Sequence, residues 1–451
     1  MIGGDPGKVF RGISIDSRTI KRGDLFIALR GARFDGHQFL KEAVAKGGEG
    51  VIVETISLGP KDATELEGKA VIAVADTLRA LGDIAHFWRG KHPIPLIAVA
   101  GSNGKTTTKE IIATLLGGTF RVLKNVGNRN NLVGLPLTVL DLCPEHTVAV
   151  VEMGMNQRGE IERMTEIANP DVGLLTNISE THLEGIGTFE KLVKAKGELW
   201  DTMRSDGVIV VNQDDPHVVK CAGSYPGKKV TFGLEVPSDV MAVNIRVQGG
   251  KGARCTLVLG GEKVDVVLPM MGISSVYNTL AGTAVASVFG VRLEEIKQRM
   301  EQFKPFPMRM EIIPLDNGAT IINDAYNANP RSMELALKAL SEVREAERRI
   351  AVLGDMLELG QCSDEAHARI GERVVSLGVD FLFTLGPQAS IIAKGARRAG
   401  LDDSRIMASM DHRDLTLRIR ETIQGGDWIL VKGSRSMSME KIVFGLVEEG
   451  K

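Results

Sequence analysis

The segment AGSNGKTTTKE, residues 100–110, has the residue types and the flanking pattern of a phosphate-binding loop. An apolar run, IPLIAVA, precedes it, and apolar residues at helical spacing follow it. Glycines in such a loop let backbone N–H groups face phosphate oxygens, and the helix N-terminus adds about half a positive charge. Lys105 would neutralise phosphate charge and Thr106 would offer its hydroxyl to Mg²⁺, and the residues expected around the phosphates are Gly101, Ser102, Asn103, Gly104, Lys105, Thr106 and Thr107. The strict pattern has glycine where this chain has Val99, and the alternative is a plain glycine turn before an amphipathic helix.

Other polar residues stand where later apolar runs end. Glu152 ends the run VAVVE, and a carboxylate there suits Mg²⁺, which takes hard oxygen ligands; a solvated strand-end residue is the alternative. Asn156 and Arg158 follow in a glycine-flanked loop, where they could contact a substrate or simply be exposed. His182, in TNISETHLEGIG, could bind a metal, orient a proton or be structural. Its position beside Asn177, at the end of the preceding strand, favours a functional role.

Lys196 falls on the apolar stripe of a predicted helix. The other members of that stripe are Phe189, Leu192, Val193, Leu199, Trp200 and Met203. A lysine on an apolar face usually extends its ammonium group to water. The sharper hypothesis is a lysine that points inward near the metal site, where desolvation would lower the pKa of its amine.

The C-terminal third carries further polar clusters beside predicted strands. The segment 323–333 places hydrogen-bonding and stacking groups where a strand meets a helix: Asp324, Tyr326, Asn327, Asn329 and Arg331. The turn 430–440 places Lys432 and Ser434 before a helix, as a possible anion-binding nest. Arg309 could bind a phosphate through two hydrogen bonds. Ordinary helix capping, and a plain hinge arginine, are the alternatives.

The N-terminal third gives a weaker signal. Ser17, Arg18, Asp35, Gly36 and His37 stand at turns between short predicted strands. By themselves these residues are more typical of turns than of a binding site, and we consider them only as candidate substrate contacts.

Short apolar runs alternate with helical patterns along almost the whole chain, which is typical of α/β folds with mostly parallel, doubly wound sheets. A length of 451 residues favours about three domains. We place them at residues 1–92, 93–304 and 305–451, the last boundary lying in the proline-containing segment FKPFPMR. Because ligands bind beyond the carboxyl ends of strands in such sheets, the polar strand ends predict a site along one sheet edge.

Composition excludes several classes of protein. With 43% hydrophobic and 25% charged residues and a net charge of −2, the chain is neither disordered nor basic enough to have nucleic acid as its main partner. No apolar run is long enough for a membrane span, and the N-terminus lacks the apolar region of a signal peptide. Four scattered cysteines without a CxxC pair favour free thiols in the cytoplasm.

In their order, the motifs resemble those of the Mur ligases, the ATP-dependent amide-forming enzymes of peptidoglycan precursor synthesis. The matching segments span nearly the whole chain: DSR, GDLFIAL, FDGHQF, GSNGKTTTKE, EMGMNQRGEI, TNISETHLEGIG, AKGELW, NDAYNANP, GDMLELG and VKGSRSMSME. DAYNAN, GDMLELG and KGSRS favour the last-adding ligase of the family. The first DSR motif lies close to the N-terminus, so an element usual ahead of it in the family is expected to be missing or truncated.

The resemblance implies three domains: a UDP-substrate domain, a central ATPase and a mobile Rossmann-like domain that closes on ATP. It implies a monomer that uses ATP and two Mg²⁺ ions to join UDP-N-acetylmuramoyl-tripeptide to D-alanyl-D-alanine through an acyl phosphate. Carried onto this sequence, Glu152 binds the first ion, His182 the second, and Lys196 is carbamylated. Asn278 lies near the adenine, and Arg309 and Asp324 complete the ATP site. The chain departs from the family's G-x-H-N segment at Ser274 and Ser275.

Two other hypotheses remain open at this point. The scaffold could belong to a sibling ligase or to an enzyme like folyl-polyglutamate synthase, although the DSR and FDGHQF segments argue against the folate case. It could also be a nucleotide-dependent regulatory module, which would bind or slowly hydrolyse ATP without forming an amide. A second metal site, formed by Glu152, His182 and Lys196 together, argues against such a switch.

Overall fold

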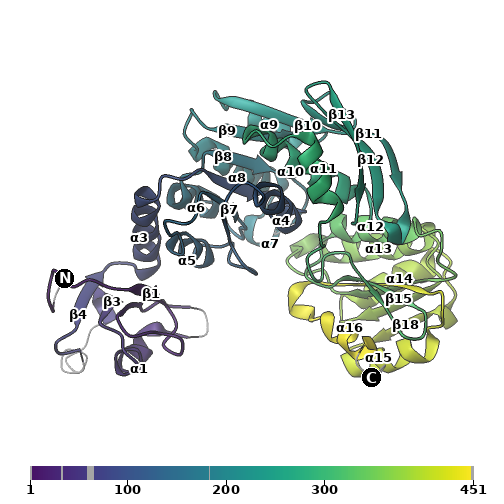
Figure 1. Cartoon of the computed structure of the whole chain (residues 1–451). Coiled ribbons are helices and arrows are strands. Elements are labelled where there is room, and N and C mark those ends of the chain that lie inside the picture. The colour runs from purple at the N-terminus through teal and green to yellow at the C-terminus, as the bar shows by residue number, and fades with distance from the viewer. Residues whose placement is uncertain (1–2, 32–33, 58–65, 182, 448–451) are drawn as a thin grey trace. The chain divides into compact units, whose positions relative to one another are not determined.

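The computed structural model describes residues 3–31, 34–57, 66–181 and 183–447, and the account below concerns these residues (Figure 1). The chain divides into two compact units. The first comprises the residues up to Ile94 with Asn125–His146 and Arg163–Asn169, and the second comprises the rest. No helix in the described ranges has the length and apolar character needed to span a bilayer.

The first unit is built on a parallel sheet of four strands. In sheet order these are β1 (Gly12–Ser14), β2 (Asp24–Ile27), β3 (Gly50–Glu54) and β4 (Ala70–Val74). Its helices are η1 (Gly36–Phe39), α1 (Leu40–Ala45), η2 (Thr55–Ser57), α3 (Thr77–Lys91) and α5 (Gly134–Leu140). Alternate strand residues pack on opposite faces: Phe26 joins a cluster with α1, and Ile27 joins one with α3 and α5.

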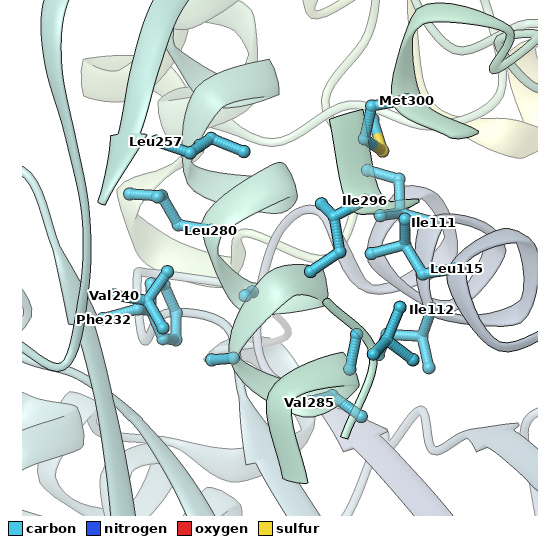
Figure 2. Close-up of a cluster of buried hydrophobic side chains, with 14 of the residues drawn as sticks. Ile111, Ile112, Leu115, Phe232, Val240, Leu257, Leu280, Val285, Ile296 and Met300 are labelled. Carbon is cyan, nitrogen blue, oxygen red and sulfur yellow. The ribbon is translucent and has the colours of Figure 1, made fainter. Parts of the chain in front are cut away.

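The second unit begins with a nine-stranded sheet of order β13-β12-β11-β10-β9-β8-β5-β7-β6. Its strands are β5 (Leu96–Ala100), β6 (Val122–Lys124), β7 (Val148–Glu152), β8 (Val172–Leu175), β9 (Val208–Asn212), β10 (Lys228–Gly233), β11 (Val240–Val247), β12 (Ala253–Leu259) and β13 (Glu262–Leu268). They are parallel except where β12 pairs with β11 and β13. Figure 2 shows α10 (Ile273–Val288) between apolar side chains of the strands and those of α4 (Lys105–Leu116) and α11 (Leu293–Glu301). The remaining helices of this unit are α7 (Leu183–Ile186), α8 (Phe189–Thr202), α9 (Pro216–Ala222) and η3 (Gly249–Lys251), whereas most of α6 (Glu160–Ala168) belongs to the first unit.

A six-stranded sheet of order β14-β15-β19-β16-β17-β18 follows in the same unit. Its strands are β14 (Glu311–Pro314), β15 (Thr320–Asp324), β16 (Arg349–Gly354), β17 (Phe381–Leu385), β18 (Ile406–Ser409) and β19 (Trp428–Lys432), parallel except for the edge strand β14. Helices α12 (Pro330–Ser341), α13 (Ser363–Ser376) and α14 (Ala389–Arg398) share one apolar cluster, and α15 (His412–Thr422) and α16 (Glu440–Val447) share another. Short turns η4 (Gly360–Cys362), η5 (Asp403–Arg405) and η6 (Arg435–Met437) complete it.

Neighbouring residues of one strand separate these two clusters. Ile322 packs with the α12–α14 cluster and Ile321 with the α15–α16 cluster. Because successive strand side chains point to opposite faces, helices cover both faces of this sheet, as in a doubly wound fold. The predicted α/β class with mostly parallel sheets is therefore confirmed.

Candidate active site

The phosphate loop connects β5 to α4, as the sequence predicts. Gly101 and Gly104 adopt φ values of 132° and 79°. Both positions lack room for a side chain, because a Cβ would lie 2.1 Å from Thr176 Oγ1 at Gly101 and 2.4 Å from Asn278 Oδ1 at Gly104. Glycine is thus required twice, for backbone conformation and for space. The first N–H groups of α4 have no intrahelical acceptors and remain suited to an anion.

Polar groups at the end of β8 fix the shape of the loop. The N–H of Ser102 donates to Asn177 O at 2.8 Å, and the N–H of Asn103 donates to Asn177 Oδ1 at 3.1 Å. Thr176 Oγ1 donates to Asn103 O at 2.7 Å. The strand-end residues therefore hold the loop in place. The sequence predicted that Asn177 stands at this strand end, but not that it contacts the phosphate loop.

Thr106 and Glu152 form the oxygen-rich part of the site. The Thr106 hydroxyl donates to Glu152 Oε2 at 2.9 Å, and both residues are buried. Thr106 Oγ1 also accepts a hydrogen bond from Arg309 Nη2 at 3.1 Å. Two hard oxygen donors beside a phosphate loop suit Mg²⁺, which keeps water and phosphate oxygens as its other ligands. Within the described ranges, no three acidic, histidine or cysteine side chains gather as a metal cluster; His182 lies outside those ranges.

Two lysines approach the same loop. Lys105 Nζ donates to Ser102 O at 3.0 Å, and Lys196 Nζ donates to Gly101 O at 3.1 Å. Lys196 is 1% exposed, so its side chain points inward from α8 and does not reach water. Burial is the main cause that lowers the pKa of each amine, and Lys105 lowers the pKa of Lys196 further by repulsion. Glu152 opposes both shifts.

Arg309 reaches this cluster from the segment between α11 and β14. Met308 and Met310, on either side of it, have positive φ values of 59° and 53°. The Arg309 guanidinium stacks 3.9 Å from the centroid of the Tyr326 ring, and its Nε is buried without a hydrogen-bond partner in the described structure. An unpaired donor of this kind beside Thr106 suits an oxyanion such as a phosphate.

Asp324 and Lys432 are joined to each other. Lys432 Nζ donates to Asp324 Oδ2 at 2.5 Å and to Asn327 O at 2.9 Å, and both charged side chains are buried. Asp324 Oδ1 accepts from the N–H of Met310 at 3.2 Å, so this pair supports the Arg309 segment. Burial, chiefly, lowers the pKa of Lys432, against the pull of Asp324.

A cavity of about 360 Å³ opens beside the phosphate loop, within the size range of small-molecule sites. It is lined by Asn103, Gly104, Thr176, Asn177, Ile178, Ser179, Asn212, Asp214, Asp215, Pro216, His217, Phe232, Ile273, Ser274, Tyr277, Asn278, Ala281, Arg331 and Leu335. Predicted residues Asn278 and Arg331 belong to this lining. Ser274 faces the cavity too, whereas the buried Ser275 donates to Gly272 O at 2.7 Å.

Asp214 and Tyr277 line this cavity, although they were not predicted as site residues from the sequence. Tyr277 Oη donates to Asp214 Oδ2 at 3.0 Å, and Asp214 also accepts from the N–H of Val236 at 2.8 Å. Burial, with the Asp214 hydrogen bond second, raises the pKa of the Tyr277 phenol, which keeps it neutral. The available signal was the position of Asp214 directly after the apolar run that ends at Asn212.

The other predicted contacts lie apart from this cluster or are engaged elsewhere. Ser434 Oγ accepts from the N–H of Leu357 at 2.8 Å, and Asn327 Oδ1 accepts from the N–H of Arg435 at 3.3 Å. Asn156 is exposed in the loop before α6, and Thr107 is half-buried on α4.

In the first unit, the predicted residues mainly form turns. His37 donates from Nδ1 to Asp35 at 2.6 Å and accepts at Nε2 from the N–H of Glu54 at 2.9 Å. Gly36 donates its N–H to Leu29 O at 2.8 Å. Ser17 is buried, while the exposed Arg18 pairs with Asp16 at 2.7 Å.

Comparison with known proteins decides the family. The Mur ligase middle domain model matches residues 99–286, the Mur ligase glutamate ligase domain model matches 308–435, and the Mur ligase family catalytic domain model matches 9–89. The chain belongs to the Mur ligase family. The resemblance drawn from the motifs is thus confirmed, and this chain is a ligase of that family.

Individual relatives show which members of the Mur ligase family this chain is similar to. It is 36% identical over 441 residues to UDP-N-acetylmuramoyl-tripeptide–D-alanyl-D-alanine ligase of Bacillus subtilis (strain 168), covering 98% of this chain and 94% of the relative. A crystal structure of MurF from Acinetobacter baumannii matches with a TM-score of 0.88 at 32% identity, covering 98% and 94% of the two chains. MurF of Thermotoga maritima, solved in complex with ADP, matches with a TM-score of 0.86 at 27% identity, covering 97% of each.

Proposed function

We propose that this Mur ligase joins D-alanyl-D-alanine to UDP-N-acetylmuramoyl-tripeptide and converts ATP to ADP and phosphate. The observation that carries the proposal is the cluster at the phosphate loop, where Lys105, Lys196 and the Thr106–Glu152 pair meet. The identity to the B. subtilis ligase, over nearly the full length of both chains, supports this substrate pair over those of sibling ligases.

The reaction runs in two steps. The terminal carboxylate of the tripeptide attacks the γ-phosphorus of ATP, so an acyl phosphate forms and ADP leaves. The amine of D-alanyl-D-alanine then attacks the acyl carbon, and the tetrahedral intermediate collapses to the amide with loss of phosphate and a proton. Both steps develop negative charge on phosphate oxygens, and fixed donors and cations aimed at that charge lower the barrier.

This chain's residues have separate parts in that chemistry. The N–H groups at the start of α4 and the Lys105 ammonium bind the phosphates. Arg309, whose Nε is buried and unpaired in the described structure and whose Nη2 lies beside Thr106, donates to a phosphate oxygen. The cavity beside the loop takes the adenosine part, with Asn278 and Tyr277 in its wall. Asp324, which pairs with Lys432, positions the Arg309 segment through Met310.

Mg²⁺ fits the donor set that is present. Thr106 Oγ1 and Glu152 would hold one ion, and bound Mg²⁺ would offset phosphate charge. We infer that Lys196, inward and with a lowered pKa, is carbamylated in the active enzyme, which would turn a buried cation into an anionic oxygen ligand. With His182, that group would hold a second ion.

We assign the nucleotide-sugar end of the substrate to residues 1–92, ATP to 93–304 and the amine substrate to 305–451. For the first of these, Asp35 and His37 shape the turn and Arg18 offers an exposed guanidinium. In the third, Tyr326 stacks on Arg309, the buried Lys432 donates to Asn327 O, and Asn327 and the buried Ser434 accept from the N–H groups of Arg435 and Leu357.

The test measures phosphate release from ATP and Mg²⁺ with UDP-N-acetylmuramoyl-tripeptide, with and without D-alanyl-D-alanine, and the product mass. Release that depends on both substrates, with a pentapeptide product, is expected. Lys105→Met should lower turnover by at least about a hundredfold, while Lys191→Met, at an exposed position on α8, should not. A new amide only with a single amino acid, or ATP hydrolysis without any amide, would overturn the proposal.

A further inference from the structure

The phosphate loop makes a direct contact with α12 that the mechanism above does not use. Asn329 Nδ2 donates to Asn103 Oδ1 at 2.7 Å, although 226 positions separate the two residues. Asn103 Nδ2 in turn donates to Ser179 Oγ at 2.9 Å. The Asn103 amide is therefore held from two sides, by the loop after β8 and by the start of α12.

Asn329 is itself fixed by its own helix. It is the N-cap of α12: its Oδ1 accepts from the N–H of Ser332 at 2.9 Å, and Ser332 Oγ accepts from the N–H of Asn329 at 3.0 Å. This capping box uses the oxygen of the Asn329 amide and leaves the NH₂ group for Asn103. Ser or Asp would cap equally well, but neither offers a donor at that reach.

The same helix forms part of the nucleotide cavity. Arg331 and Leu335, in the first two turns of α12, line the cavity together with Asn103 and Gly104 of the loop. Any movement of α12 away from the loop would break the Asn329–Asn103 hydrogen bond and remove one wall of the cavity. A single contact thus joins the phosphate loop to the helix that supplies another part of the cavity wall.

We propose that the Asn103–Asn329 pair is a latch that holds α12 over the bound nucleotide, with Asn329 as a positioning residue that acts through Asn103. The proposal rests on ATP being the ligand of this cavity. It explains why the N-cap of α12 is asparagine and not another good capping residue. Loss of the latch should weaken nucleotide binding without unfolding the helix.

The experiment compares Asn329→Ser, Asn103→Ala and the double variant with Ser332→Ala as the matched control. Asn329→Ser keeps the cap but cannot reach Asn103, whereas Ser332→Ala weakens the capping box and leaves the latch. Calorimetry gives the affinity for ADP with Mg²⁺, steady-state ligation gives KM for ATP and kcat, and thermal unfolding reports the fold.

Asn329→Ser should weaken ADP binding and raise KM for ATP about fivefold, the usual worth of one hydrogen bond. Ser332→Ala should change them less than about twofold. The double variant should be no weaker than Asn103→Ala, because both changes remove the same contact. Independent, multiplying effects on ADP affinity, or unchanged affinity in Asn329→Ser, would overturn the latch. Absence of ligation in the wild-type enzyme with normal ADP binding would instead overturn the proposed function and leave the latch to be decided by calorimetry.

Discussion

Replacing Lys196 by methionine should stabilise the protein while it abolishes ligation. The Lys196 side chain is 1% exposed and donates to one backbone carbonyl, that of Gly101. Burial, with repulsion from Lys105 second, holds the pKa of its amine well below the ordinary lysine range. Folding therefore either buries a cation or strips it of its proton, and both cost free energy relative to the hydrated lysine of the unfolded chain.

The size of the effect follows from the contacts. Replacing the charged groups of a buried ion pair by apolar side chains of similar volume is often neutral or stabilises a protein by about 1–4 kcal/mol, and we apply this range to the buried Lys196. The substitution also removes the hydrogen bond to the Gly101 carbonyl, and this loss offsets about 1 kcal/mol of the stabilisation. The substitution also removes the attraction of Glu152 and Glu160 for the Lys196 charge. Glu152 still has a neighbouring cation in the variant, because Lys105 is unchanged. We expect a net gain of about 1–3 kcal/mol at neutral pH.

The gain should depend on pH in a fixed direction. Because the folded pKa of Lys196 is depressed, the unfolded chain binds more protons between that pKa and about 10.4, so wild-type stability rises with pH across this window. Methionine does not titrate. The advantage of Lys196→Met should be largest below the folded pKa and should shrink as the pH approaches 10.

The measurement is thermal unfolding from pH 7 to pH 10 in buffers depleted of carbon dioxide, so that the amine remains unmodified. Trp200, buried one turn further along α8, reports the local transition by fluorescence. Lys194→Met, at an exposed position of the same helix, is the control and should show neither the gain nor the pH dependence. A Lys196→Met protein that is less stable than wild type at pH 7, or an advantage that stays constant with pH, would refute the reasoning.

Three further predictions concern the loop, the metal ligand and a buried histidine. Gly104→Ala places a Cβ 2.4 Å from Asn278 Oδ1 at a residue with positive φ, so calorimetry should show that the affinity for ADP falls at least about tenfold. Gly90→Ala, whose Cβ would meet open space, should leave the affinity for ADP unchanged. Glu152→Gln keeps an acceptor for Thr106 but removes the charge, and a Mg²⁺ titration of ligation should need at least about ten times more Mg²⁺; an unchanged requirement would exclude Glu152 as a ligand. His367 accepts a hydrogen bond from the N–H of Met356 at 3.0 Å, and burial is the main cause that lowers its pKa, although Asp355 and Asp364 oppose the shift. Because the unfolded chain then binds the proton more readily, wild-type stability should fall as the pH drops below about 6.5. In His367→Gln the melting temperature should fall less over the same range, and an equal fall would contradict this account.

The sequence is informative where chemistry depends on neighbours along the chain. Lys105 and Thr106 are recognisable because a strand, a glycine loop and a helix follow one another within about twenty residues. Lys196 was detectable from helical spacing, although spacing alone favoured a side chain that reaches water. Only the packing of α8 against the loop decides between these, since the apolar stripe is compatible with both.

Contacts between distant segments could not be predicted in this way. Arg309 reaches Thr106 across 203 positions because Met308 and Met310 take positive φ values, which neither residue type suggests. The carboxylate of Asp324 accepts from Lys432, a partner 108 positions away that its motif does not indicate. Such pairings depend on strand order in the six-stranded sheet, where β15 and β19 are neighbours although three strands, β16 to β18, lie between them along the chain. Neither the apolar pattern nor the motifs reveal this order.

The charges at the phosphate loop indicate how the binding of a polyphosphate changes the protonation of its lysines. Lys105, Lys196 and Arg309 lie close enough that each lysine has its pKa lowered by a neighbouring cation, while Glu152 attracts both lysines. A polyphosphate bound at this loop would reverse the sign of the local field and raise the pKa of both amines. By linkage, nucleotide binding should then be accompanied by proton uptake wherever an amine is neutral in the free protein. Carbamylation of Lys196 removes that amine from the exchange, so the number of protons taken up on ADP binding distinguishes the modified enzyme from the unmodified one.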